Sequence, residues 1–233
     1  MKLGIIGAMD VEVAALKAKM ENVTTATHAA SAYFEGTLEG TPAVVVQCGV
    51  GKVNAAMCAQ VLCSVYGVTH IVNTGIAGSL CADLDIGALV ICRDAMYHDF
   101  DCVHFGYEMG KVPGMDVVAF PANESMIAAA VSAAEAENPG HSKIGRIATG
   151  DLFVAAKPAK EAIIAKTGAL CTEMEGAAIA QTAYRNGIPY VILRAISDKA
   201  DDSADMDYPT FERIAAHRCA AVTVEFARRL RNR

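Results

Sequence analysis

The chain has 233 residues and a mass of 24.4 kDa, and its 20 basic and 26 acidic residues give a net charge of −6 at pH 7. No run of Lys or Arg stands out before the last six residues, so nucleic acid is not expected as the principal partner. No stretch approaches the ~20 apolar residues of a membrane span, and the amino terminus becomes acidic too early for a signal peptide. We expect a soluble, cytoplasmic protein with one α/β domain over residues 1–233.

Cysteine and histidine spacing gives no sign of a metal or a disulfide framework. The eight cysteines contain no CxxC pair and lie mostly inside apolar runs, which is typical of reduced core residues. The six histidines show neither HExxH nor another paired spacing, so no metal site is expected.

The first expected strand, Leu3–Ala8, is followed by a helix that Asp10 can cap. Val13, Leu16 and Met20 recur on one face of that helix. Glu12 therefore lies in the first helical turn, where the helix dipole stabilises a carboxylate. It is either a simple N-terminal charge or a site residue placed directly after a strand.

A hairpin and a glycine turn follow. Ser31–Leu38 and Ala43–Cys48 have the pattern of an antiparallel pair. Gly49–Lys52 then leads into a helix that extends to about Tyr66. The spacing is not that of a Walker motif, although a two-glycine turn does offer free amides to an anion or a hydroxyl.

The middle of the chain combines a glycine-rich turn with an irregular segment. The strand His70–Thr74 runs into a loop, Gly75–Ser79, whose small residues indicate close approach of the backbone to a ligand or a neighbouring strand. Ala88–Arg93 continues the sheet. The polar and aromatic stretch from Tyr97 to Gly114 is expected to cover a pocket or a subunit interface. The remaining expected elements are the helix Asn123–Glu135 capped by Asn123, the strand Lys143–Thr149, the helix Lys157–Lys166 and a last helix that begins near Tyr208.

The stretch from Leu170 to Asp201 reads as strand, helix and strand. Its helix ends at Gly187, and its second strand is Tyr190–Ile196. A right-handed crossover with parallel strands would bring Glu173 and Glu175 to the same sheet edge as Ser197 and Asp198. Each acid alone could be an ordinary solvated loop residue. Three acids and Arg194 at two neighbouring strand ends favour a site.

The motifs leave carboxylate chemistry without a metal. There is no GxSxG nucleophile elbow, and no GxGxxG follows the first strand, which disfavours hydride transfer. Two carboxylates in different surroundings can cleave a glycosidic bond, because one protonates the leaving group while the other activates water. A third acid can hold ribose hydroxyls.

Six short motifs occur in order along the chain: GIIGAMxxE (Gly4–Glu12), GVGK (Gly49–Lys52), NTGxAG (Asn73–Gly78), YHD (Tyr97–Asp99), EME (Glu173–Glu175) and AISD (Ala195–Asp198). They resemble those of the 5′-methylthioadenosine/S-adenosylhomocysteine nucleosidases, within the nucleoside phosphorylase superfamily. The resemblance covers nearly the whole chain. It implies one domain with a central mixed β-sheet flanked by helices, a homodimer, a small-molecule nucleoside substrate and no cofactor.

The same resemblance implies roles for individual residues. Asp198, oriented by Ser197, would be the acid that serves N7 of adenine. Glu12, helped by Arg194, would activate the attacking water. Glu175 and Met174 would hold the ribose, Phe153 would stack on adenine, and the Val154 backbone would read its amino edge. The other substrate-binding residues would be Met9, Val50, Ala77, Gly78 and Tyr208, with Phe105 and Pro113 contributed by the partner subunit.

Two positions differ from the family, and other functions remain open. Members often have Ser where this chain has Ile76, and Phe where it has Tyr208. A phosphorylase would need arginines around phosphate, which Glu12 would repel. An aminodeoxyfutalosine hydrolase is a further alternative within the fold. A nucleoside-binding domain without activity is disfavoured, because binding alone needs no acid and base together.

Overall fold

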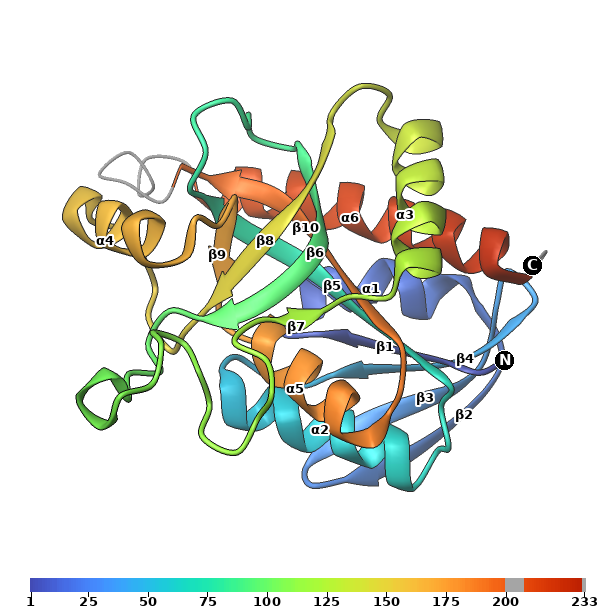
Figure 1. The fold of residues 1–233 in the computed structure, drawn as a ribbon. Coiled ribbons are helices and arrows are strands. Elements are labelled where there is room, and N and C mark those ends of the chain that lie inside the picture. The colour runs from blue at the N-terminus through green and yellow to red at the C-terminus, as the bar shows by residue number, and fades with distance from the viewer. Residues whose placement is uncertain (200–207, 232–233) are drawn as a thin grey trace.

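The computed structural model describes residues 1–199 and 208–231, and at 208 and 209 the backbone only. The described residues form one ten-stranded sheet with helices packed against both faces (Figure 1). The strands are β1 (Leu3–Gly7), β2 (Met20–His28), β3 (Ser31–Leu38), β4 (Thr41–Gln47), β5 (His70–Ser79), β6 (Leu89–Tyr97), β7 (Phe120–Pro121), β8 (Ser142–Thr149), β9 (Cys171–Glu173) and β10 (Tyr190–Asp198). The helices are α1 (Asp10–Lys19), α2 (Lys52–Ser64), the 3₁₀ turn η1 (Val103–Phe105), α3 (Glu124–Glu137), α4 (Lys157–Thr167), α5 (Gly176–Asn186) and α6 (Tyr208–Arg231).

The sheet is mixed and partly closed. Strands β4, β1, β5 and β10 are parallel neighbours, and β3 and β2 extend the sheet as an antiparallel ribbon. On the other side of β10, β6 is antiparallel to it, and β8 and β9 run parallel to β6. Because β9 also pairs with β5, the strands β10, β6, β8, β9 and β5 form a ring. The expected central mixed sheet flanked by helices is confirmed.

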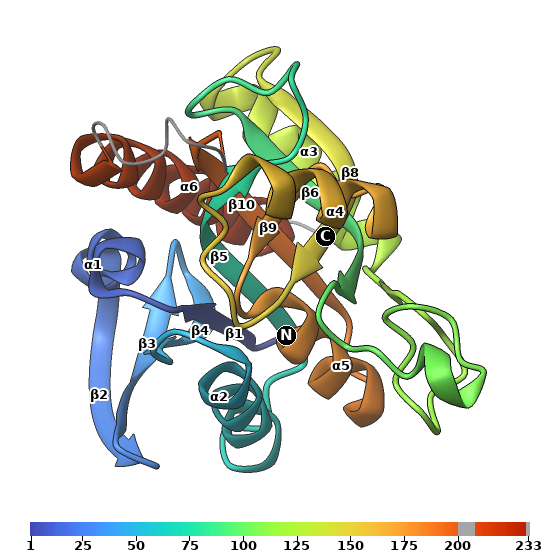
Figure 2. The ribbon, with the colours of Figure 1, turned by 90° about the vertical axis from the view of Figure 1, so that its left-hand side faces the viewer.

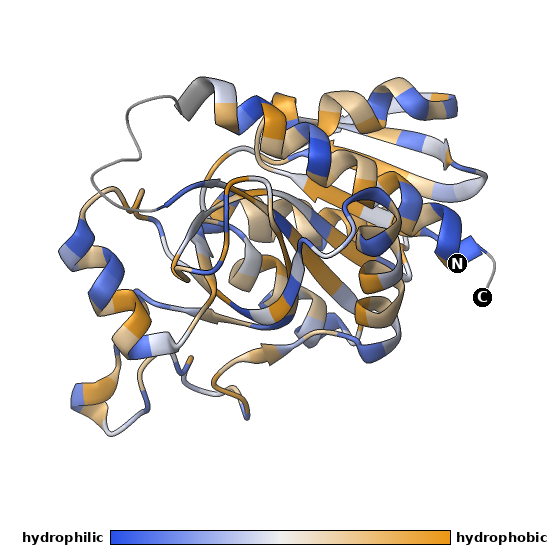
Figure 3. Cartoon of the chain, turned by 90° about the horizontal axis from the view of Figure 1, so that it is seen from above, coloured by the Kyte–Doolittle hydropathy of each residue, from blue (hydrophilic) through white to orange (hydrophobic). Residues whose placement is uncertain are grey.

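Two helical layers cover the sheet, and each has its own apolar core. Helices α2 and α5 pack on one face, while α1, α3 and α6 pack on the other (Figure 2). The apolar side chains concentrate in the central strands and the sheet-facing sides of these helices (Figure 3). None of the helices in the described part of the chain combines the length and apolar character that a bilayer crossing needs.

Several local predictions are confirmed. The hairpin between β3 and β4 closes through Glu39 and Gly40, which have φ angles of 50° and 73°; two left-handed residues are what a tight two-residue hairpin turn requires. The Asn123 side chain accepts a hydrogen bond from the Met126 amide at the start of α3. Gly187 ends α5 in the left-handed conformation.

The prediction of parallel strands around α5 is wrong. Strand β9 is antiparallel to β5, through Gly78 and Thr172, and β5 is parallel to β10. Strands β9 and β10 therefore run in opposite directions, because the sheet curls into a ring and α5 links its two sides. The carboxyl end of β9 meets β10 near its middle, at Arg194, rather than at its end.

The N-terminal boundaries also differ from expectation. The residue that caps α1 is Met9, with Asp10 as its first helical residue. Met20 does not continue the helix but starts β2, an edge strand that the sequence pattern did not reveal because most of its side chains are exposed on both faces. The stretch Gly75–Ser79 is not a loop; it is the second half of β5 and pairs with strands on both sides.

Candidate active site

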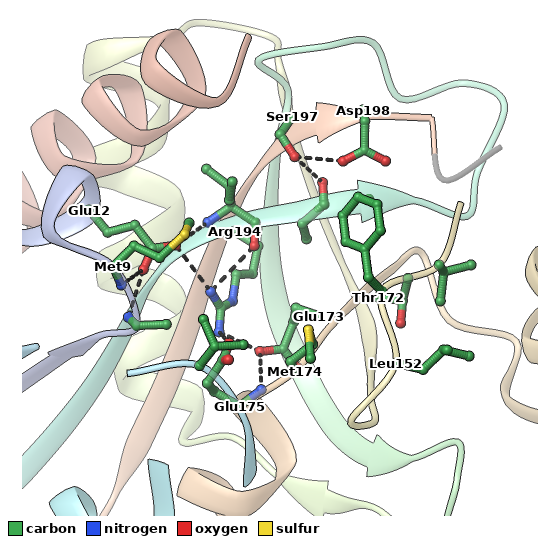
Figure 4. A pocket seen from close by; sticks show the side chains of 17 residues that line it. Met9, Glu12, Leu152, Thr172, Glu173, Met174, Glu175, Arg194, Ser197 and Asp198 are labelled. Atoms are coloured by element: carbon green, nitrogen blue, oxygen red, sulfur yellow. Dashed lines mark hydrogen bonds and ion pairs between the residues drawn. The ribbon is translucent and has the colours of Figure 1, made fainter. Parts of the chain in front are cut away.

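A cavity of about 370 Å³ opens where β1, β5, β9 and β10 come together. Its size is within the range of small-molecule sites, which are roughly 300–1,000 Å³. Figure 4 shows its labelled acids pointing toward a common space, with Arg194 between Glu12 and Glu175. The lining residues are Ala8, Met9, Glu12, Val50, Ile76, Ala77, Gly78, Leu152, Phe153, Val154, Thr172, Glu173, Met174, Glu175, Arg194, Ser197 and Asp198.

Glu12 is held in one orientation by the backbone. It is the third residue of α1, and its Oε2 accepts hydrogen bonds from the amides of Ala8 (2.6 Å) and Met9 (3.0 Å). Its Oε1 accepts from the Ile76 amide on β5 at 3.0 Å. Three amide donors and the N-terminus of a helix all favour an ionised carboxylate, so Glu12 is arranged as an anion beside the cavity.

Arg194 is the buried cation of the site. Its guanidinium is 1% exposed and donates to Asn73 Oδ1 at 2.6 Å and to the Ile76 carbonyl at 3.3 Å. Burial alone would lower the pKa of Arg194, but the carboxylates of Glu173, Glu175 and Glu12 outweigh it and raise that pKa. A permanently charged arginine therefore links three acids.

Glu173 is fixed by four donors from three elements. It accepts hydrogen bonds from Arg194 Nη2 and the Thr149 hydroxyl, and from the amides of Glu175 (3.1 Å) and Gly176 (2.7 Å). The last two amides belong to the N-terminus of α5, where a carboxylate is stabilised by unpaired amides and the helix dipole. Glu173 thus fixes both Arg194 and the start of α5.

Glu175 is the acid whose protonation is most perturbed. Its Oε1 accepts from the Gly51 amide at 2.8 Å, and its Oε2 lies 3.4 Å from Arg194 Nη2. Burial raises the pKa of Glu175 to about 7; the neighbouring Glu173 and Glu12 also raise it, while Arg194 and the Gly51 amide oppose them. This carboxyl group changes its charge near neutral pH.

The raised pKa predicts how stability depends on pH. The folded protein binds the Glu175 proton more tightly than the unfolded chain does, so this stabilisation is full below the unfolded pKa and is lost as pH rises through about 7. Replacing Glu175 by Gln removes the titration. As pH rises from 5 to 8, the parent should lose about 1–3 kcal/mol more of its free energy of unfolding than Glu175→Gln loses. Urea unfolding of both proteins at each pH measures this difference. Glu161→Gln, on an exposed side chain of α4, is the control, and an equal pH dependence in parent and Glu175→Gln would contradict the prediction.

Ser197 and Asp198 close the other end of the cavity. The Ser197 hydroxyl donates to Asp198 Oδ2 at 2.8 Å, and both residues are buried. Asp198 is the last residue of β10, where a register irregularity aligns it with Gly78 of β5. The kinked strand end turns the carboxyl group toward the cavity, on the far side of it from Glu12 (Figure 4).

One wall of the cavity is apolar. Phe153 and Val50 are about half exposed at its mouth, and Val154 is buried behind Phe153. A flat apolar wall with acids opposite it suits a ligand that has an aromatic face on one side and hydroxyl groups on the other.

Most residues named from the sequence come together here. All site residues predicted from the sequence line the cavity except three. The side chain of Tyr208 lies outside the described part of the structure. Phe105 and Pro113 are exposed and are not in this chain's cavity lining, with Phe105 at 78% exposure; both were expected to act in a partner's site.

Sequence reasoning left out several lining residues, of which Glu173 is the most important. The sequence places it among the strand-end acids that favour a site but gives it no individual role. Glu173 and Glu175 are two positions apart, and this strand-like spacing was the available signal that both could face the cavity. The other omitted residues are Ala8, Ile76, Leu152 and Thr172. Among the described residues, no group of three or more His, Cys, Asp and Glu could hold a metal ion.

Fold and site together define the class of protein. The model of the Phosphorylase superfamily matches residues 2–228. A 5′-methylthioadenosine/S-adenosylhomocysteine nucleosidase of Psychromonas ingrahamii is 38% identical over 233 residues, which are 99% of this chain and 100% of the relative. The chain belongs to the 5′-methylthioadenosine/S-adenosylhomocysteine nucleosidase family of that superfamily, as its motifs predicted.

Solved structures agree with this assignment. The nucleosidase of Colwellia psychrerythraea 34H in complex with adenine superimposes with a TM-score of 0.95 and 35% identity, covering 99% of this chain and 96% of that one. The Streptococcus pneumoniae nucleosidase with a transition-state inhibitor gives 0.93 and 34%, covering 99% and 100%. A futalosine hydrolase of Helicobacter pylori is also similar, with 0.92 and 29% over 97% of each chain.

Proposed function

We propose that the protein hydrolyses the N-glycosidic bond of 5′-methylthioadenosine and S-adenosylhomocysteine, and of 5′-deoxyadenosine, to adenine and the 5-substituted ribose. The observation that carries the proposal is the pair Glu12 and Asp198, which face one cavity from opposite sides, with Arg194 beside Glu12 and Glu175 lining the same cavity (Figure 4). The activity named for the family members, and the adenine bound by the Colwellia enzyme, support the same assignment.

Asp198 is proposed to protonate the leaving base. Adenine is a poor leaving group until it is protonated, so a positioned acid at N7 contributes roughly 10²–10⁴-fold to the rate. Ser197 donates to Asp198 Oδ2, which fixes the orientation of the carboxyl group that would carry the proton. As the bond from C1′ to N9 breaks, its electron pair goes to the base and the sugar becomes oxocarbenium-like.

Glu12 is proposed to activate the attacking water. A carboxylate has about four lone-pair positions, and three of those on Glu12 accept backbone amides. One position therefore remains for a water hydrogen. The water oxygen bonds to C1′ while its proton passes to Glu12, and Arg194, whose Nη1 is 3.8 Å from Glu12 Oε1, stabilises the carboxylate until it takes that proton.

Glu175 is proposed to hold the ribose hydroxyls. In its ionised form it is an acceptor for both hydroxyls, and Met174 lies beside it in the cavity lining. Phe153 and Val154 would receive the purine, and Met9 and Val50 the 5′ substituent. Water rather than phosphate is expected as the nucleophile, because Arg194 is already engaged by three carboxylates, which leaves no free cation there for phosphate.

Product analysis tests the proposal. Adenine release from several 5′-substituted adenosines should proceed at the same rate with and without phosphate, and should yield the free sugar. A ribose 1-phosphate product would show a phosphorylase instead. No adenine release from any of these nucleosides would contradict the hydrolase assignment.

A second candidate reaction is hydrolysis of aminodeoxyfutalosine. The structural similarity to the futalosine hydrolase of H. pylori favours it, and both substrates would use the same acid and base. Comparing kcat/KM for aminodeoxyfutalosine and 5′-methylthioadenosine on the same preparation ranks the two. We expect the second nucleoside to be preferred, given the higher identity to the nucleosidases.

The proposed setting is methionine salvage in the cytoplasm. Methylthioadenosine and adenosylhomocysteine carry the sulfur of methionine. Their cleavage releases adenine and leaves the sulfur on the 5-substituted ribose, from which later reactions could recycle it. All eight cysteines are free thiols, and five of them are buried. Unpaired cysteines in this number are typical of a reducing compartment.

The protein is also proposed to act as a homodimer. The irregular segment 100–114 exposes Val103, Phe105 and Tyr107, and just after it Asp116 accepts a hydrogen bond from Tyr184 of α5. Helix α2, which packs beside α5 (Figure 2), exposes Val53 at 70% and Met57 at 43%. These apolar groups are the kind of surface that a second subunit covers.

Sedimentation should show a species of twice 24.4 kDa at micromolar concentration. Phe105→Ala should raise KM by about tenfold if the ring reaches the partner's cavity, since losing one buried aromatic contact costs ~1–2 kcal/mol. Val23→Ala, on the exposed edge strand β2, is the matched control. A fully active species of 24.4 kDa alone would contradict the dimer.

A further inference from the structure

Three charged side chains outside the cavity lining connect three separate loops. Lys52 is the first residue of α2, Asp99 follows β6, and Asp151 follows β8. Lys52 Nζ lies 2.6 Å from Asp99 Oδ2 and 3.6 Å from Asp151 Oδ2. The motifs GVGK and YHD thus meet in one cluster. The proposed reaction gives no role to their residues Lys52 and Asp99.

The backbone is part of the same network. Asp99 Oδ2 also accepts a hydrogen bond from the Asp151 amide at 2.9 Å, and Asp151 Oδ1 accepts from the Lys52 amide at 2.9 Å. The residue that caps α2 is Gly51, which has no side chain to cap the helix. Asp151 therefore supplies, from another loop, the acceptor that an N-terminal helical amide needs.

The three loops are in close contact at this point. Gly51 has a φ of 100°, and a Cβ added there would lie 3.2 Å from Asp151 Oδ1. A Cβ at Gly150 would lie 2.3 Å from the ring of His98. Burial would raise the pKa of Asp99, but Lys52 and the Asp151 amide hold it below its ordinary value, so Asp99 is ionised at neutral pH.

Two of the three connected loops continue into walls of the cavity. Gly51 donates its amide to Glu175 Oε1 at 2.8 Å, and Val50 lines the mouth. Asp151 directly precedes Leu152, Phe153 and Val154, which line the apolar wall. The cluster therefore sets the position of the apolar wall relative to the side that holds Glu175.

We propose that Lys52, Asp99 and Asp151 are positioning residues that fix the apolar wall at the distance a purine requires from Glu175. This inference rests on the proposed function, because it takes the ligand to be a purine nucleoside. Partly exposed ion pairs such as these contribute little to global stability. A misplacement of 1 Å in a binding site can nevertheless cost roughly 10²-fold in activity, so binding should change more than folding.

The test compares Asp99→Ala, Asp99→Asn and Lys52→Met. Adenine is the probe, and its Kd by calorimetry needs no turnover. Asp99→Ala removes both the charge and the acceptor of the Asp151 amide and should raise the adenine Kd and the KM for 5′-methylthioadenosine by about tenfold or more. Asp99→Asn keeps an acceptor and should recover part of that loss. The single-turnover rate at saturating substrate should stay within about threefold of the parent, because none of these residues touches the reacting atoms.

Lys143→Met, which removes the remote exposed pair with Asp83, is the matched control. Hydrogen exchange at the Asp151 amide is a second readout that is independent of ligand, and it should accelerate in Asp99→Ala but not in the control. An unchanged adenine Kd, or unchanged exchange, in Asp99→Ala would overturn the inference. If the parent protein binds no adenine, the proposed function fails, and exchange at Asp151 alone decides whether the cluster holds the wall.

Discussion

Asp198→Asn should slow the chemical step by roughly 10²–10⁴-fold while leaving substrate binding nearly unchanged. The substitution keeps the shape of the side chain, and its amide oxygen can still accept the Ser197 hydrogen bond. It has no proton to pass to the leaving base. Single-turnover release of adenine measures the step, and the Kd of an unreactive adenosine analogue measures binding.

Two further variants are needed to interpret the result for Asp198→Asn. Asp83→Asn changes an exposed acid outside the cavity lining and should alter the rate by less than about tenfold, or ~1.4 kcal/mol of barrier. Glu12→Gln should also slow the reaction strongly. Its effect is not confined to the chemical step, because the NH₂ group of Gln cannot accept the backbone amide hydrogen bonds that the carboxylate accepts. Near-parent turnover in both Asp198→Asn and Glu12→Gln would overturn the division of labour between acid and base.

The sequence predicted the site better than it predicted the path of the chain around it. Glu12, Glu175 and Asp198 could be named because each lies at a strand end or in a first helical turn, which are local features. The closure of the strands into a ring could not be predicted, because it depends on pairing between β5 and β9. Hydrophobic periodicity does not indicate which strands distant in the sequence pair with each other.

The role of Glu173 required the structure for a related reason. From the sequence, Glu173 and Glu175 are equivalent strand-end acids. The difference arises from their partners. Glu173 accepts the Thr149 hydroxyl, Arg194 and two amides at the start of α5. Glu175 accepts one amide and a longer contact of 3.4 Å from Arg194. One acid is held by the protein and the other is available to a ligand, and only the three-dimensional contacts separate them.

Gly75→Ala should nearly abolish activity, with a loss of about 10²-fold or more expected from displaced catalytic groups. Gly75 is in the middle of β5, directly beneath the ion pair of the site. An added Cβ would lie 2.2 Å from Glu12 Oε1 and 2.3 Å from Arg194 Nη1. Both side chains are buried and hydrogen-bonded, so neither can move without breaking contacts. Steady-state kcat/KM and the free energy of unfolding are the measurements.

Gly145→Ala separates the loss of the site from ordinary overpacking. Gly145 is also in a strand of the sheet, and its added Cβ would lie 2.3 Å from Leu170 Cδ1, the flexible end of an apolar side chain outside the cavity lining. Both variants should be destabilised by about 1–3 kcal/mol. Only Gly75→Ala should lose activity at temperatures where both proteins remain folded, because only there does the methyl group displace Glu12, the carboxylate that we propose activates the water. Equal kcat/KM in the two variants would show that the contact between Glu12 and Arg194 is not needed for the reaction.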